Sequence, residues 1–172
     1  TYIAASSPAL ARQIQATLAA SGLHLPISQE AKDLGVGYTA ASKVRRVSIQ
    51  RARIVAGVRR TVRIGRFTRA LRKSKSLFPT GAKPKAFYGV AAHGIAPSGL
   101  RKLRAAAANC CGVKAKGKCA TTCIHVALGP PNDPAVASPL AMVKTWFEIW
   151  RERPDLRPQV RRTWSKLLRR LD

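Results

Sequence analysis

The chain has 172 residues, of which 46% are hydrophobic, and its 32 lysines and arginines against 7 acidic residues give a net charge of +25. The hydrophobic share excludes a basic disordered tail, and no apolar run reaches the ~18 residues that a membrane span requires. The sequence also has no charged-then-apolar leader, so we expect a nuclear or cytoplasmic protein that is neither secreted nor membrane-inserted.

The N-terminal segment predicts a helix followed by a small β element. Ser7 supplies a capping hydroxyl, Pro8 suits the first helical position, and apolar residues recur every fourth position up to Leu18. An alternating pattern at residues 23–27 predicts one short strand. Residues 33–38, which contain two glycines, predict a second one.

A long basic helix is predicted over residues 42–74. Its apolar residues step by three, four or seven, and its cations follow on a neighbouring stripe. Residues 34–132 contain 21 lysines and arginines and no acidic residue, so the helix repels itself and needs an external polyanion. Gly57 and Gly65 predict a kink or close packing. The expected apolar side consists of Val44, Val47, Ile54, Val58 and Val62.

Shorter helices are expected downstream. Residues 78–81 predict a turn, residues 83–92 a short helix, residues 97–112 a longer helix and residues 121–128 another short one. After Asp133 the composition changes, and two further helices carry all three tryptophans. Their helical spacing favours packing of the tryptophans over base stacking.

Four cysteines, Cys110, Cys111, Cys119 and Cys123, lie within 14 positions, with His125 nearby. No C-x2-C pair is present, and adjacent cysteines bind one tetrahedral zinc poorly. Small buried residues on alanine-rich helices are therefore the favoured interpretation, and a metal site is the alternative. The scattered histidines and few carboxylates predict no catalytic residue.

The arginine-rich segment predicts sequence-independent binding of nucleic acid. A solvated charged face usually mixes signs, whereas this one has no acid, and a planar guanidinium grips phosphate oxygens through two parallel hydrogen bonds. Such contacts position a backbone without reading bases. The predicted phosphate contacts are Arg45, Arg46, Arg53, Arg59, Arg60, Arg63, Arg66, Arg69, Arg72 and Lys73, with Lys114, Lys116 and Lys118 as a second cluster.

In chain order, several segments resemble the region that follows the catalytic core in non-LTR (LINE-type) retrotransposon reverse transcriptases. Residues 32–36 match a K-x-L-G-V strand, and residues 43–75 match a long basic thumb helix. A P-x-x-x-Y-G segment corresponds to residues 84–89, and L-x-x-L spacing recurs at residues 100–103. The resemblance covers residues 1–112.

The resemblance implies that residues 1–40 form the end of the palm, residues 41–112 the thumb and residues 113–172 a helical extension. We expect a mainly α fold: a helical bundle with a long basic helix and a two-stranded β element near residues 23–38. The parent protein would be an RNA-directed DNA polymerase that needs Mg. This chain lacks the paired aspartates of that site, so no cofactor, metal or catalytic residue of its own is expected. Asp33 replaces the family's usual aromatic residue.

The partners implied are a primer–template duplex, such as an RNA–DNA hybrid, and the upstream catalytic domain of the same polypeptide. One alternative is a stand-alone basic nucleic-acid-binding protein of ribosomal or chromatin type. Such a protein should start with its own methionine, whereas this chain begins at Thr1, so we expect a piece of a longer polypeptide. A second alternative is a structural helical protein whose basic face docks on an acidic protein.

Overall fold

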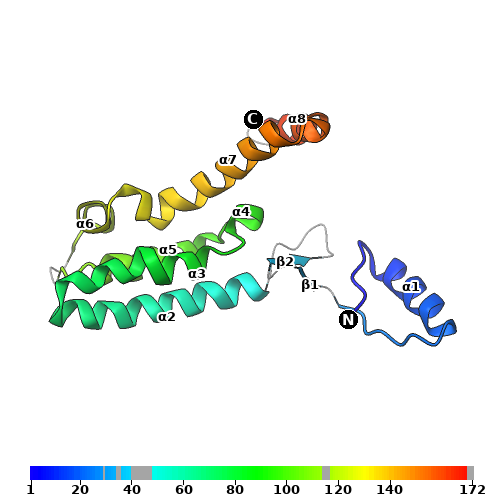
Figure 1. The fold of residues 1–172 in the computed structure, drawn as a ribbon, viewed down its shortest axis with the longest axis horizontal. Coiled ribbons are helices and arrows are strands. Elements are labelled where there is room, and N and C mark those ends of the chain that lie inside the picture. The colour runs from blue at the N-terminus through cyan, green and yellow to red at the C-terminus, as the bar shows by residue number, and fades with distance from the viewer. Residues whose placement is uncertain (29, 34–35, 40–47, 114–116, 170–172) are drawn as a thin grey trace.

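The computed structural model describes residues 1–28, 30–33, 36–39, 48–113 and 117–169. This part of the chain is mainly helical, as predicted, with one small antiparallel sheet (Figure 1). In chain order the elements are α1 (Pro8–Ala20), β1 (Glu30–Asp33), β2 (Val36–Thr39), α2 (Ser48–Ala70), η1 (Arg72–Ser76), η2 (Phe78–Ala82), α3 (Lys83–Phe87), α4 (Val90–His93), α5 (Pro97–Cys110), α6 (Ala120–Leu128), η3 (Pro130–Asn132), α7 (Pro134–Glu152), η4 (Pro154–Leu156) and α8 (Arg157–Leu168).

Helix α1 begins as the sequence predicts and lies apart from the other helices, beyond the β1–β2 hairpin (Figure 1). The Ser7 hydroxyl accepts a hydrogen bond from the Leu10 N–H at 3.2 Å, which satisfies a donor left free at the start of the helix. Gln15 Nε2 donates to the Leu25 carbonyl at 2.8 Å and ties the helix to the segment that follows.

The two-stranded element is present, but its first strand is β1 (Glu30–Asp33) rather than residues 23–27. Ile27 makes only an isolated parallel bridge with Ile3, because Pro26 has no N–H with which to extend a ladder. The predicted second strand, residues 33–38, overlaps β2. The strands β1 and β2 pair antiparallel, and Glu30 lies opposite Thr39.

One face of α2 packs against the rest of the helical body, and its residues are more often small or polar than apolar. They step by four and three, the spacing of one helix face. The buried residues are Gln50, Ile54, Gly57, Thr61, Ile64 and Thr68. The hydroxyls of Thr61 and Thr68 donate to carbonyls one turn earlier, so neither is an unsatisfied buried donor. Of the residues predicted on the apolar side, Ile54 is buried and Val58 packs against the core, whereas Val62 is 47% exposed. Val44 and Val47 lie outside the described residues.

Gly57 and Gly65 provide close packing, one of the two outcomes predicted for them. A Cβ atom placed on Gly57 would lie 2.6 Å from the Cβ of Ala86 in α3. A Cβ atom on Gly65 would lie 3.3 Å from the Cα of Cys110 in α5. The two glycines therefore let α2 approach both helices closely, and α2, α3 and α5 lie side by side (Figure 1).

The segment between α2 and α5 is more helical than the sequence predicts. Residues 78–81, expected as a turn, belong to the π-helical turn η2, and Phe78 within it is fully buried in the core. The helix expected over residues 83–92 is divided into α3 and α4, because Gly89 adopts a φ of +84°, a conformation that favours glycine.

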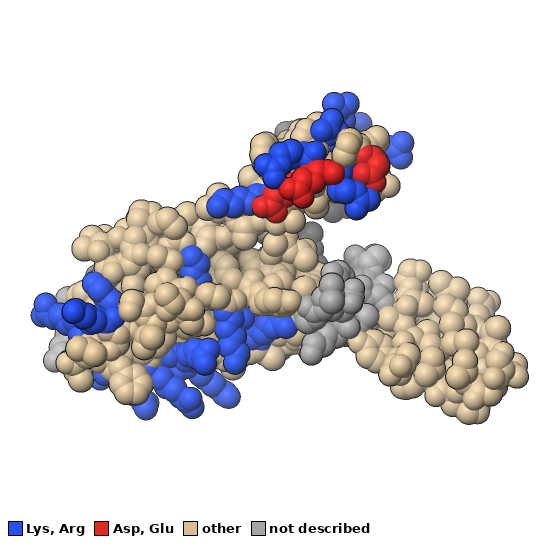
Figure 2. All heavy atoms as spheres, in the orientation of Figure 1, with Lys and Arg blue, Asp and Glu red and all other residues tan. Residues whose placement is uncertain are grey.

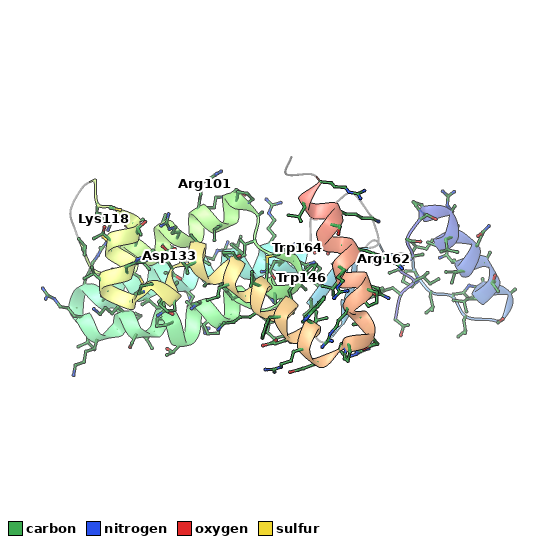
Figure 3. The ribbon with its side chains drawn as sticks, turned by 90° about the horizontal axis from the view of Figure 1, so that it is seen from above. Arg101, Lys118, Asp133, Trp146, Arg162 and Trp164 are labelled. Atoms are coloured by element: carbon green, nitrogen blue, oxygen red, sulfur yellow. The ribbon has the colours of Figure 1, made fainter. Side chains whose placement is uncertain are left out.

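Asp133 joins three helices and is fully buried. It caps α7, as predicted, by accepting from the Ala135 N–H at 2.9 Å. The guanidinium of Arg104 in α5 donates to both of its carboxylate oxygens at 3.0 Å and also contacts the Thr121 hydroxyl in α6. Figure 3 shows Asp133 between α6 and the start of α7. This buried ion pair holds α5, α6 and α7 together.

The three tryptophans contact one another or nearby arginines where α7 faces α8. The rings of Trp146 and Trp164 meet edge to face with centroids 6.1 Å apart (Figure 3). The guanidinium carbons of Arg157 and Arg161 lie 5.5 and 5.2 Å from the centroid of the Trp150 ring. The sequence favours buried packing over base stacking; Trp146 and Trp150 are partly buried, whereas Trp164 is 53% exposed. No helix in the described part of the chain is long and apolar enough to cross a membrane.

Substituting Gly57→Ala should destabilise the fold by about 1–2 kcal/mol. Overpacking against Ala86 costs roughly 1–3 kcal/mol and outweighs the ~1 kcal/mol that alanine contributes in a helix. Gly81→Ala is the matched control, because a Cβ there meets nothing within 4 Å. Urea unfolding measures both variants. Equal stability of the two would contradict the close approach of α2 to α3.

Substituting Asp133→Asn should lower the free energy of unfolding by about 2–3 kcal/mol, because it leaves Arg104 without its anion. The loss is smaller than for a fully enclosed pair, since the Arg104 side chain is 32% exposed. In the control variant Asp155→Asn, which loses the exposed pair with Arg153, the midpoint of thermal unfolding should not change measurably. A similar effect of both substitutions would show that the buried pair does not hold the junction.

Candidate nucleic-acid interface

Most cations of α2 and η1 point away from the packed side of the helix. The packing through Gly57 turns the opposite side of α2 toward solvent, and Figure 2 shows lysine and arginine side chains gathered along this edge of the body. We call seven exposed cations the cationic face; they are Arg59, Arg60, Arg63, Arg66, Arg69, Arg72 and Lys73.

Among the side chains that the structure describes, no carboxylate pairs with the cationic face. Glu30 is engaged at the start of α2, where it accepts from the Ser48 N–H at 3.0 Å and from the Ser48 hydroxyl. Apart from Asp33 in β1, the other described acids follow residue 132, and Glu152 and Asp155 form ion pairs with neighbouring arginines. Unneutralised cations on one helix face repel one another, so an external anion stabilises this arrangement.

A groove of about 600 Å³ runs along α2 and includes part of the cationic face. We call it the α2 groove, and its walls combine cations with exposed apolar side chains. η1 and α3 border the groove, because Leu77 follows η1 and Lys85 lies in α3. Among its lining residues are Arg59, Arg60, Arg63, Lys85, Val55, Phe67 and Leu77.

Arg53, one of the predicted phosphate contacts, is held by Tyr88 and is only partly exposed. Its Nη1 atom donates to the Tyr88 carbonyl at 3.2 Å, and its guanidinium carbon lies 4.6 Å from the centroid of the Tyr88 ring. A cation over an aromatic face is attracted by the ring quadrupole. Arg53 therefore fixes the start of α2 against the residue that follows α3.

The remaining predicted contacts divide by position. Arg45, Arg46, Lys114 and Lys116 lie outside the described residues. Lys118 is only partly exposed, and its Nζ donates to the Val113 carbonyl at 2.7 Å. The sequence pattern predicts that Arg72 and Lys73 continue the helical stripe of α2, but they do not. The backbone is extended at Leu71, and both residues lie on the 3-10 helix η1.

Sequence reasoning missed Lys85 and the exposed apolar residues of the α2 groove. Lys83 and Lys85 look equivalent in sequence, but Lys83 Nζ donates to the Pro131 carbonyl at 2.7 Å and to Asn132 Oδ1 at 2.9 Å. Burial lowers the pKa of Lys83. Lys85 is exposed beside the cations of α2. Only the packing of α3 against α2 distinguishes the two lysines.

The cysteines are all free, and no group of potential metal ligands occurs among the described residues. Cys110 and Cys111 are buried in the core, as the packing interpretation predicts, whereas Cys119 is exposed. Hydrogen bonds from the backbone and side chain of Thr122, at the start of α6, lower the pKa of Cys119 to about 7. Its thiolate therefore forms at a lower pH than that of an ordinary cysteine.

Three segments of the reverse-transcriptase resemblance meet at Gly89. A Cβ atom placed on Gly89 would lie 3.5 Å from Val36 Cγ1 in β2, 3.6 Å from Gln50 Oε1 and 3.7 Å from Arg53 Nη1 in α2. The strand, the basic helix and the Y-G pair thus share one packed junction. Both the close approach and the positive φ at this position favour glycine.

Comparisons of the chain with protein-family models, with curated protein sequences and with solved structures found no match.

Proposed function

We propose that this chain is the thumb and helical extension of a retroelement reverse transcriptase, and that its cationic face holds the primer–template duplex. The observation that carries the proposal is the exposure of seven cations on α2 and η1 without a carboxylate partner in the described residues. A surface of this kind concentrates a polyanion, and each phosphate that it neutralises releases condensed counterions.

The junction at Gly89 supports the particular family. The resemblance rests on short segments, and chance matches to short segments need not meet in space. Here Val36 from the strand segment, Arg53 from the basic helix and Tyr88 from the P-x-x-x-Y-G segment are packed around one glycine. The order hairpin, long basic helix, short helices and α5 also agrees with the order that the resemblance implies.

In this proposal the chain contributes positioning and the parent polymerase contributes the chemistry. Arginine forks on an exposed helix contact phosphate oxygens and leave the bases unread, so the duplex can move by one base pair after each addition. The Mg of the parent enzyme would be held by carboxylates outside this chain. The cationic face would keep the duplex from dissociating between additions.

Binding of a short RNA–DNA hybrid to the chain should weaken about a thousandfold or more between low and moderate salt, as expected for roughly six neutralised phosphates. The double variant Arg59→Gln/Arg66→Gln should make the plot of log K against log salt shallower by about two. Fluorescence anisotropy over a salt series measures both quantities.

The matched control is Arg151→Gln/Arg153→Gln, which removes the same charge from two exposed arginines that already pair with Glu152 and Asp155. Its salt dependence should equal that of the unmodified chain. An equal loss in both double variants would mean that net charge, and not the cationic face, holds the hybrid.

A further inference from the structure

The α2 groove carries more exposed apolar surface than contact with phosphates requires. Phe67 is 64% exposed, Leu77 50% and Val55 44%. They lie in one groove with Arg59, Arg63 and Lys85. Phosphate binding explains the cations but gives no reason to expose a phenylalanine beside them, because apolar surface gains nothing from contact with a charged oxygen.

The groove combines an exposed aromatic ring with cations and has no acidic residue among its lining residues. This combination is complementary to single-stranded nucleic acid. Sequence-tolerant sites for single strands combine a positive groove that follows the backbone with aromatic side chains on which bases stack. A base within a duplex has both faces covered by its neighbours. An unpaired base has a free π face and a negative phosphate on each side of it.

We infer that the α2 groove binds an unpaired strand of nucleic acid, with one base stacked on Phe67 and the adjoining phosphates on Arg63 and Lys85. The inference rests on the proposed function and extends it: the duplex lies on the cationic face, and the single strand that continues from it enters the groove, which shares Arg59, Arg60 and Arg63 with that face. The groove of about 600 Å³ falls within the roughly 300–1,000 Å³ of typical ligand pockets.

Phe67→Ala in the full chain tests the stacking. The probes are a short oligothymidylate and an oligomer with the same number of phosphates but abasic sugars. The variant should bind oligothymidylate about 5- to 150-fold more weakly, the equivalent of ~1–3 kcal/mol for one stacked base, and should bind the abasic oligomer as before. Phe67→Trp should keep the preference for bases, and Phe67→Leu should lose it.

Two controls separate stacking from other effects. Leu71→Ala removes a side chain that is 60% exposed near Phe67 but is not among the residues lining the groove, and it should leave both affinities unchanged. Arg63→Gln should weaken both oligomers alike, because both carry phosphates. Since Phe67 is largely exposed, its substitution should not unfold the chain.

Equal effects of Phe67→Ala on both oligomers, or no effect on either, would overturn the stacking inference. If the hybrid still binds with a steep salt dependence in that case, the proposed function stands and the groove serves another partner, such as a protein helix. If neither the hybrid nor the oligomers bind, the proposed function fails as well.

Discussion

The close packing of α2 through two glycines is the constraint on which the rest of the structure depends. Gly57 and Gly65 bring α2 against α3 and α5, so the small and polar residues of one helix face are buried. The opposite face then has no place in the core, and it carries arginines that are stable only in contact with water or an anion. A larger residue at either glycine would separate the helices and alter the walls of the α2 groove.

Charge is divided unequally between the parts of the chain. Most described acids follow residue 132; the exceptions are Asp33 in β1 and Glu30, which is engaged at the start of α2. In the middle of the chain, Arg104 is paired with the buried Asp133, and Lys83 is bound to η3, so these two cations stabilise the fold. The cationic face has no such pairing among the described side chains. The proposed function follows from this division.

The sequence predicts the helical class, the caps at Ser7 and Asp133, and the exposure of the arginines, because each depends on local spacing or on charge. It predicts the buried side of α2 only in part. Ile54 and Val58 of the predicted apolar side face the core, but Val62 is exposed, and glycine, threonine and glutamine complete the buried side. The sequence does not predict the α2 groove either, because Lys85 and Leu77 line the same groove as Phe67 only through packing between elements.

The NMR signals of the arginine Nε–Hε groups, recorded while a short RNA–DNA hybrid is added to the chain, test the central claim most directly. The account predicts that the signals of Arg59, Arg63 and Arg66 shift together as the hybrid binds. The signals of Arg104, paired with Asp133, and Arg153, paired with Asp155, should remain in place. Shifts spread evenly over all arginines, or confined to those after residue 132, would contradict the account.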